Sequence, residues 1–220
     1  MTTNFPDKLL SGYRAFKENR FAREQKRYRT LADQGQSPDI MVIACCDARA
    51  APETIFDSAP GEIFVVRNVA NLVPPYEPDG TYHSTSAALE FAVQSLKVKH
   101  IVVLGHGRCG GIQAALNPNS EPLSPGDFIG KWMELIAPAA SALSSSPLSS
   151  AEIQTELERA SVRYSVTNLR SFPCVNILES RNRLTLHAAW FDIAEGNLWL
   201  MDPETENFAP LRQRSGAAID

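Results

Sequence analysis

Three short apolar runs rich in β-branched residues place the strongest constraint on the fold of this 220-residue chain. They span residues 40–45, 63–66 and 101–104, and turn or helical segments separate them. Runs of this kind are typical of parallel strands that are buried on both faces. Residues 82–96 carry apolar side chains at helical spacing, so they supply a crossover helix between the second and third predicted strands.

The first part of the chain predicts a long helix. Residues 7–31 combine an apolar stripe with a highly charged continuation, and the helix should end near Gly35. The stripe is too narrow to form a core alone, so it must pack on the body of the protein or on another subunit. We expect residues 1–35 to form an N-terminal helical arm and residues 36–220 to form a single α/β domain. The stripe consists of Leu9, Leu10, Tyr13 and Phe16.

The stretch from residue 117 to residue 150 is rich in Pro and Ser and indicates a surface excursion. Within it, residues 127–137 have a helical pattern that Pro138 should end. Ser149 and Glu152 have the spacing of a capping box, which predicts the start of another helix. The apolar stripe of that helix is expected at Ile153, Leu157, Ala160 and Tyr164.

The last third of the chain predicts a β-hairpin. Residues 184–193 and 198–202 flank the turn sequence Glu195-Gly196-Asn197. The whole pattern therefore predicts an α/β fold with a mostly parallel central sheet flanked by helices, an N-terminal helical arm and a C-terminal antiparallel hairpin.

Composition excludes several classes of partner. The net charge is −4, and no block of like charges offers a footprint for nucleic acid or for an anionic membrane. No apolar stretch approaches the ~20 residues that span a bilayer, and the start of the chain lacks a basic region followed by an apolar one. We therefore expect a cytoplasmic protein. In a reducing cytosol, metal binding is a better use than disulfide formation for Cys45, Cys46, Cys109 and Cys174.

Cysteine and histidine side chains lie at the ends of two predicted strands. Cys45 closes the first apolar run, and His106 and Cys109 follow the third within a glycine-rich turn. Thiolate and imidazole hold Zn²⁺ in a tetrahedral shell, and catalytic sites use three protein ligands and leave one position for water. An H-x-x-C quartet alone also fits a satisfied core histidine beside a structural thiol. Its pairing with a cysteine at another strand end favours one zinc site.

The alternation of side chains along a strand sharpens this prediction. Residues i and i+2 share a face, so Cys45, Asp47 and Arg49 should face together. Cys46 should face the other way and act as a small buried hydrophobe. The sequence thus groups a thiolate, a carboxylate and a guanidinium at the end of one strand.

Several motifs follow one another along the chain at residues 36–38, 45–49, 60–71, 73–76 and 106–111, and more faintly at 128–132 and 186–192. Through these motifs the chain resembles the β-class carbonic anhydrases, and within them the plant-type branch. This resemblance implies an α/β fold, an arm that embraces a second subunit, and a dimer or higher even oligomer. It also implies a zinc-dependent lyase, with one Zn²⁺ per chain, that hydrates CO₂ reversibly to bicarbonate and a proton by means of a zinc-bound hydroxide.

The resemblance also implies roles for individual residues. Cys45, His106 and Cys109 match the zinc ligands, and Asp47 and Arg49 match the acid and base pair beside the metal. In this family the neighbouring subunit supplies part of the pocket, so a dimer would be the catalytic unit. The positions that match the CO₂ and bicarbonate pocket are Gln36, Phe64, Val69, Phe91 and Gly110.

Other functions remain open at the level of the sequence. The same zinc scaffold could hydrolyse CS₂ or COS if access to the site were narrowed. A zinc-stabilised oligomeric binding protein without activity is a second alternative, although the intact Asp47 and Arg49 argue against it. A thiol redox protein is a weaker alternative, because the chain has no C-x-x-C pair.

Overall fold

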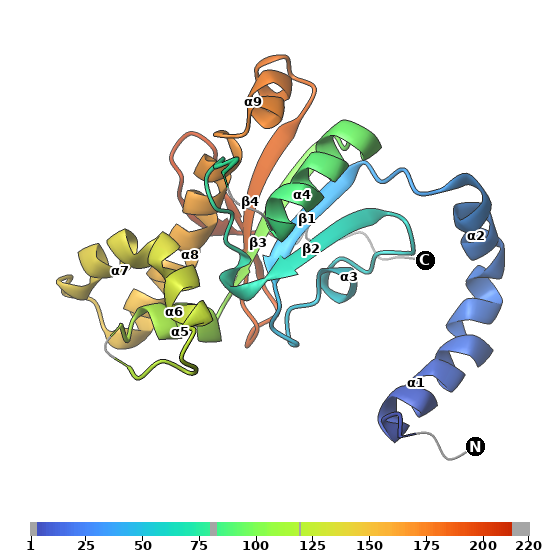
Figure 1. Ribbon diagram of the computed structural model, residues 1–220, viewed down its shortest axis with the longest axis horizontal. Coiled ribbons are helices and arrows are strands. Elements are labelled where there is room, and N and C mark those ends of the chain that lie inside the picture. The colour runs from blue at the N-terminus through green and yellow to red at the C-terminus, as the bar shows by residue number, and fades with distance from the viewer. Residues whose placement is uncertain (1–3, 80–82, 119, 213–220) are drawn as a thin grey trace.

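The computed structural model describes residues 4–79, 83–118 and 120–212. Among these residues, six strands form one sheet in the order β2-β1-β3-β4-β5-β6 (Figure 1). The first four strands in this order are parallel, and β5 and β6 are antiparallel to their neighbours. The strands are β1 (Ile40–Cys45), β2 (Ile63–Asn68), β3 (His100–His106), β4 (Thr185–Phe191), β5 (Leu198–Met201) and β6 (Phe208–Pro210). The expected mostly parallel sheet and C-terminal hairpin are therefore confirmed, and β6 is an additional strand.

Both faces of the parallel strands are buried, as their apolar sequences require. One face packs against the helical segments α4 (Ser84–Glu90), η2 (Phe91–Leu96), α8 (Ser150–Leu169) and α9 (Pro173–Ser180), and its core includes Met41, Ile43, Ile101 and Val103. The opposite face buries Val42, Ala44, Leu104 and Ala189, with Ile55 of α3 (Pro52–Ile55) packed beside them. The crossover helix expected between β2 and β3 is present as α4 and η2, and its first expected residue lies outside the described residues.

A second apolar cluster surrounds the carboxyl end of β1. It joins Cys45 and Cys109 to side chains of α5 (Gly110–Ala115), α6 (Phe128–Met133), η3 (Glu134–Ile136) and α7 (Ala137–Ser144). The interpretation of residues 117–150 as a surface excursion is therefore only partly right, because Met133 and Ile136 are buried in this cluster. Pro138 does not end the helical region. It lies in the first turn of α7, where its missing N–H has no helical partner to lose.

The helix α8 begins as the sequence predicts, but it buries a different face. Its capping box is present, with Ser149 and Glu152 bonded reciprocally. Ile153, Ala160 and Tyr164 of the expected stripe are only partly buried. The buried residues are Leu157, Glu158, Ser161, Val162, Ser165, Val166, Asn168 and Leu169, because α8 contacts both the sheet and the cluster around Cys45.

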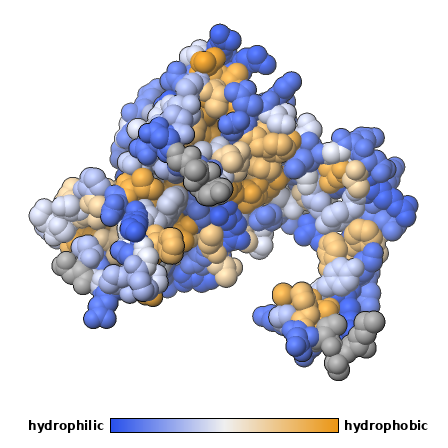
Figure 2. All heavy atoms as spheres, viewed as in Figure 1, coloured by the Kyte–Doolittle hydropathy of each residue, from blue (hydrophilic) through white to orange (hydrophobic). Residues whose placement is uncertain are grey.

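Two helices precede the sheet, where the sequence predicts one. α1 (Asp7–Glu18) and α2 (Arg20–Gln34) meet at Asn19, whose ψ of −76° departs from helical geometry. Neither helix has a buried residue, and Figure 1 shows both lying to one side of the sheet. Figure 2 shows some hydrophobic side chains on the surface of these helices. Leu9 and Tyr13 of α1 are more than half exposed. No helix in the described ranges is long and apolar enough to cross a membrane.

We expect Ser149→Ala to lower the free energy of unfolding by about 1 kcal/mol, because it removes the side chain that caps α8. Urea denaturation followed by circular dichroism would measure the change. Ser150→Ala is the matched control, since the neighbouring exposed serine makes no side-chain bond in the capping box. Equal unfolding midpoints for the two variants would contradict the role of the cap.

Candidate metal centre

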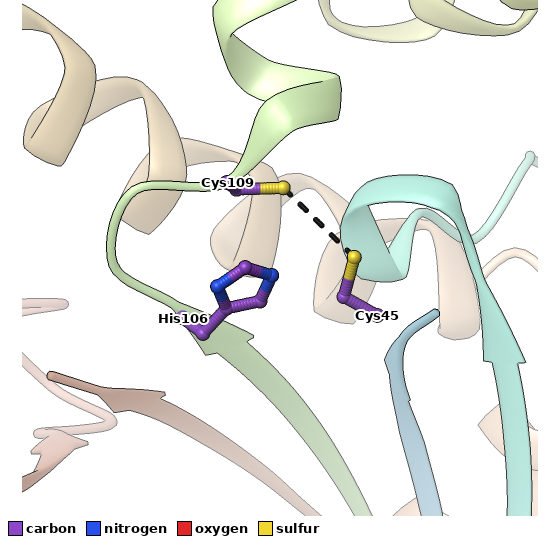
Figure 3. A group of neighbouring side chains, drawn as sticks. All are labelled: Cys45, His106 and Cys109. Atoms are coloured by element: carbon purple, nitrogen blue, oxygen red, sulfur yellow. Dashed lines mark hydrogen bonds between the residues drawn. The ribbon is translucent and has the colours of Figure 1, made fainter. Parts of the chain in front are cut away.

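The three predicted ligands come from two adjacent strand ends and one helix start. Cys45 is the last residue of β1, His106 is the last residue of β3, and Cys109 is the residue before α5. Because β1 and β3 are parallel and paired, their carboxyl ends meet at one edge of the sheet. The ligand atoms lie within 4.8 Å of one another, and all three residues are buried (Figure 3).

The donor set fits a zinc ion. The Sγ atoms of Cys45 and Cys109 lie 3.9 Å apart, and two thiolates bound to one tetrahedral zinc at about 2.3 Å would lie about 3.8 Å apart. His106 Nδ1 donates to the carbonyl of Gly107 at 2.9 Å. This bond leaves Nε2 as the free ligand atom, and Nε2 is buried without a hydrogen-bond partner in the described part of the chain. A buried, unpartnered imidazole nitrogen beside two thiols is the arrangement that a metal ion would satisfy.

The two thiols share a hydrogen bond that sets their protonation. The bond from Cys109 lowers the pKa of Cys45 well below its usual value, even though burial opposes the shift. The same bond, together with burial, raises the pKa of Cys109. One proton is therefore held between the two sulfur atoms, and a metal ion that binds both thiolates must displace it.

Asp47 and Arg49 form a tight ion pair beside the three ligands. Arg49 Nε and Nη2 donate to the two carboxylate oxygens of Asp47 at 2.9 and 2.7 Å. This bidentate bond is the main cause that holds the pKa of Asp47 well below its usual range, so the carboxylate stays ionised. Asp47 Oδ2 lies 3.9 Å from His106 Nε2. A fixed negative charge therefore stands next to the imidazole nitrogen that would bind a metal.

The prediction that Cys46 is buried is wrong. Cys46 is exposed, because β1 ends at Cys45 and the alternation of the strand does not continue beyond it. The turn that follows is held by Arg67, whose Nε and Nη2 donate to the carbonyls of Cys45 and Asp47 at 2.8 and 2.7 Å. Sequence reasoning assigned Arg67 to a turn and a dimer surface and did not connect that turn with the metal site. This role follows from the register of β1 and β2, which pairs Arg67 with Ala44, the residue before Cys45. The sequence alone does not give that register.

Glu158 is a second residue that sequence reasoning missed. Its Oε1 accepts hydrogen bonds from the backbone N–H of Cys109 at 3.0 Å and from Gln154 Nε2 at 3.1 Å. Glu158 is only 1% exposed, and burial raises the pKa of its carboxyl group. The sequence offered one signal for this role: Glu158 has the i, i+3, i+4 spacing that places it on the same helical face as Ser161 and Val162. A helix that buries this face also buries the carboxyl group.

Two of the predicted pocket residues lie beside the metal cluster. Val69 approaches Gly111 closely, since a Cβ added to Gly111 would lie 2.6 Å from Val69 Cγ1. Val69 and Gly110 line one cavity of about 510 Å³, together with Ala114 and Met133. This cavity is lined by residues of α5, which begins directly after Cys109, and the three ligand residues are not among those that line it.

The other three predicted pocket residues lie away from the metal cluster of the same chain. Phe64 pairs with Met41, four residues before the level at which Asn68 pairs with Cys45. At about 3.3 Å per residue, Phe64 is about 13 Å from that edge of the sheet. The ring of Phe91 lies 5.9 Å from the ring of Phe64 and is 47% exposed. Gln36 precedes β1 and so lies at the amino end of the strand.

Comparison with known proteins gives a consistent result. The family model described as carbonic anhydrase matches residues 40–198. The curated protein named beta carbonic anhydrase 3 of Arabidopsis thaliana is 37% identical over 90% of this chain and 78% of its own length. The protein named beta carbonic anhydrase 5, chloroplastic, of the same plant is 35% identical over 91% of this chain and 66% of its own length.

Solved structures agree with this. A structure named for the beta-carbonic anhydrase CcaA matches with a TM-score of 0.86 and 26% identity, over 94% of this chain and 92% of that chain. One of two tetrameric beta-carbonic anhydrases from Sordaria macrospora matches with a TM-score of 0.76 and 29% identity, over 89% of this chain and 95% of that chain. The fold described above is therefore shared with these enzymes.

We expect Gly111→Ala to lower the free energy of unfolding by about 1–3 kcal/mol and to reduce bound zinc, because the added methyl group would push η1 (Val69–Asn71) away from the helix start that carries Cys109. Urea denaturation and metal analysis would measure both effects. Gly110→Ala is the matched control for stability, since its methyl group would meet nothing within 4 Å. A Gly111→Ala protein as stable as Gly110→Ala would contradict this packing argument.

Proposed function

Because the chain belongs to the β-carbonic anhydrase family, we propose that it is a zinc-dependent carbonic anhydrase that catalyses the reversible hydration of CO₂ to bicarbonate and a proton. The observation that carries the proposal is the buried group of Cys45, His106 and Cys109 with the ionised Asp47 beside it. A zinc site that serves only structure has almost always four protein ligands, and the described part of the chain groups three here. The fourth position is then free for a reactant.

The three ligands would hold one zinc ion per chain. When bound, zinc supplies a Lewis acid that lowers the pKa of water toward neutrality, so that a nucleophile is available near pH 7. Asp47 would accept a hydrogen bond from the attacking water and orient its lone pair toward CO₂. Arg49 holds Asp47 by two hydrogen bonds and also donates to the carbonyl of Arg108 at 3.0 Å, so the carboxylate keeps one orientation.

Pocket residues from two subunits would complete the site. Val69 and Gly110 would line it from the subunit that binds the metal, while Gln36, Phe64 and Phe91 would line the site of a neighbouring subunit. The support is that Phe64 and Phe91 contact each other about 13 Å from the metal edge of their own chain, and that Phe91 is half exposed. An apolar wall suits CO₂, which is small and apolar.

The first 35 residues would be the arm that joins these subunits, and residues 36–220 would form the catalytic domain. Leu9 and Tyr13 expose apolar surface on α1 that a second chain would cover. A tetrameric relative of known structure supports an oligomer, and we propose a dimer as its unit. We also propose a cytoplasmic location, which suits the use of Cys45 and Cys109 as metal ligands rather than in disulfides.

Two substitutions separate zinc binding from catalysis. We expect Cys45→Ser to lose zinc and activity together, because one thiolate ligand is removed.

Asp47→Asn should keep the zinc and the oligomeric state but lower kcat for CO₂ hydration by about 100-fold or more, because the neutral amide orients the attacking water poorly. Stopped-flow CO₂ hydration and metal analysis would measure these changes. An Asp47→Asn protein as active as the wild type would refute the catalytic role of Asp47. A wild-type protein that carries zinc and releases sulfide from CS₂ or COS, but does not hydrate CO₂, would instead identify it as a CS₂ or COS hydrolase.

A mixing experiment tests the shared pocket. One subunit carries Asp47→Asn, and the other carries Gln36→Ala with Phe91→Ala, two exposed positions whose change should leave the fold intact. In a dimer with one subunit of each kind, one of the two sites has both its aspartate and its pocket residues intact. Such dimers, isolated by two affinity tags, should have about half of the wild-type activity. Activity no higher than the average of the two parent variants would show that each chain supplies its own pocket.

A further inference from the structure

Trp190 lies against the loop that carries two of the three ligands. It is 5% exposed on β4, where it pairs with Gly105 of β3, and the next pair joins Phe191 to His106. A Cβ added to Gly107 would lie 3.1 Å from Trp190 Cζ2, and one added to Gly105 would lie 3.5 Å from Trp190 Cδ1. The indole ring therefore packs close to the backbone on both sides of His106. At Gly107 a side chain would crowd the ring, whereas at Gly105 it would meet the ring at ordinary contact distance.

Trp190 is also joined to Cys109 by hydrogen bonds. Its Nε1 donates to Glu158 Oε2 at 3.2 Å, and the other oxygen of Glu158 accepts the backbone N–H of Cys109 at 3.0 Å. All three residues are buried, so each of these groups would be left unsatisfied if its partner were lost. A single carboxylate thus connects the indole N–H to the backbone of a ligand residue.

Arg159 also contacts the indole ring. The guanidinium of Arg159 lies 5.0 Å from the ring of Trp190 and 4.7 Å from the ring of Trp199, its cross-strand partner. The two tryptophans therefore share a strand pair and a stacked arginine. They differ in hydrogen bonding, because Trp199 Nε1 is buried with no hydrogen-bond partner in the described ranges.

We propose that Trp190 is a positioning residue for the metal centre: through Glu158 it fixes the backbone of Cys109, and through its ring it supports the loop after His106. The inference rests on the proposed zinc site and goes beyond it. Groups that hold metal ligands in place commonly change metal affinity or activity by about 10–100-fold when they are removed. Trp190 would act by orientation, without touching the reactants.

The first test is Trp190→Phe, which keeps an aromatic ring and removes the N–H donor. We expect zinc release to an excess of chelator to be about tenfold faster or more than in wild type. We also expect the visible absorption bands of the Co²⁺-substituted protein to change in position or intensity, because the geometry of the Cys109 thiolate changes. Trp199→Phe is the matched control, and its zinc release and Co²⁺ spectrum should stay close to those of wild type.

A double-mutant cycle tests the route through Glu158. If Trp190 acts by its bond to Glu158, then Trp190→Phe combined with Glu158→Gln should release zinc about as fast as the faster single variant. If the two effects multiply, the residues act independently and the route is overturned. Far-ultraviolet circular dichroism and the oligomeric state of each variant show whether it is folded. If Trp190→Phe does not fold, Glu158→Gln alone tests the same route, because glutamine has nearly the same volume as glutamate, and zinc release as slow as in wild type would then overturn it.

The outcomes also separate this inference from the proposed function. Zinc release and a Co²⁺ spectrum in Trp190→Phe that match those of wild type and Trp199→Phe would overturn the inference and leave the zinc site standing. Zinc retained at wild-type stoichiometry in Cys45→Ser would instead refute the proposed site itself. Faster zinc release in Trp190→Phe but not in Trp199→Phe would support the positioning role.

Discussion

The parallel pairing of β1 with β3 is the constraint on which the metal centre depends. Their register sets Ala44 opposite Leu104, so Cys45, one residue further along β1, and His106, two residues further along β3, emerge at the same edge of the sheet. A slip of one residue would turn every side chain of a strand to the other face, and the cluster would be lost. The apolar residues that bury both faces of these strands therefore hold the ligands together as well as the core.

Polar bonds then make the strand edge a defined site. Arg67 holds the carbonyls on both sides of Cys46, Arg49 holds the carboxylate of Asp47, and Glu158 holds the N–H of Cys109. Each bond restricts the orientation of a ligand residue or of a residue next to it. The metal site is thus largely organised by the protein itself, which is the condition for fast binding of a small substrate at a fixed position.

The same chain places Phe64 and Phe91, the aromatic residues of the proposed pocket, far from its own metal edge. Phe64 and Phe91 contact each other on the amino half of β2 and on η2, while the arm of α1 and α2 has no buried residue. Both features have one explanation in the proposed assembly, in which a second chain covers the arm and receives the aromatic wall. An isolated chain would then have the metal chemistry but an incomplete pocket for CO₂.

The sequence by itself determined the parallel strands and the hairpin that follows them, because such segments have a local signature, but it did not predict β6. It also determined that Cys45, His106 and Cys109 come together, because the carboxyl ends of neighbouring parallel strands meet at one edge of the sheet. It also determined the α8 capping box, which depends on four consecutive residues. Only the tertiary structure decided that Cys46 is exposed and that α8 buries Glu158. These outcomes depend on where a strand stops and on which elements pack around a helix, and such contacts join residues that are distant in the chain.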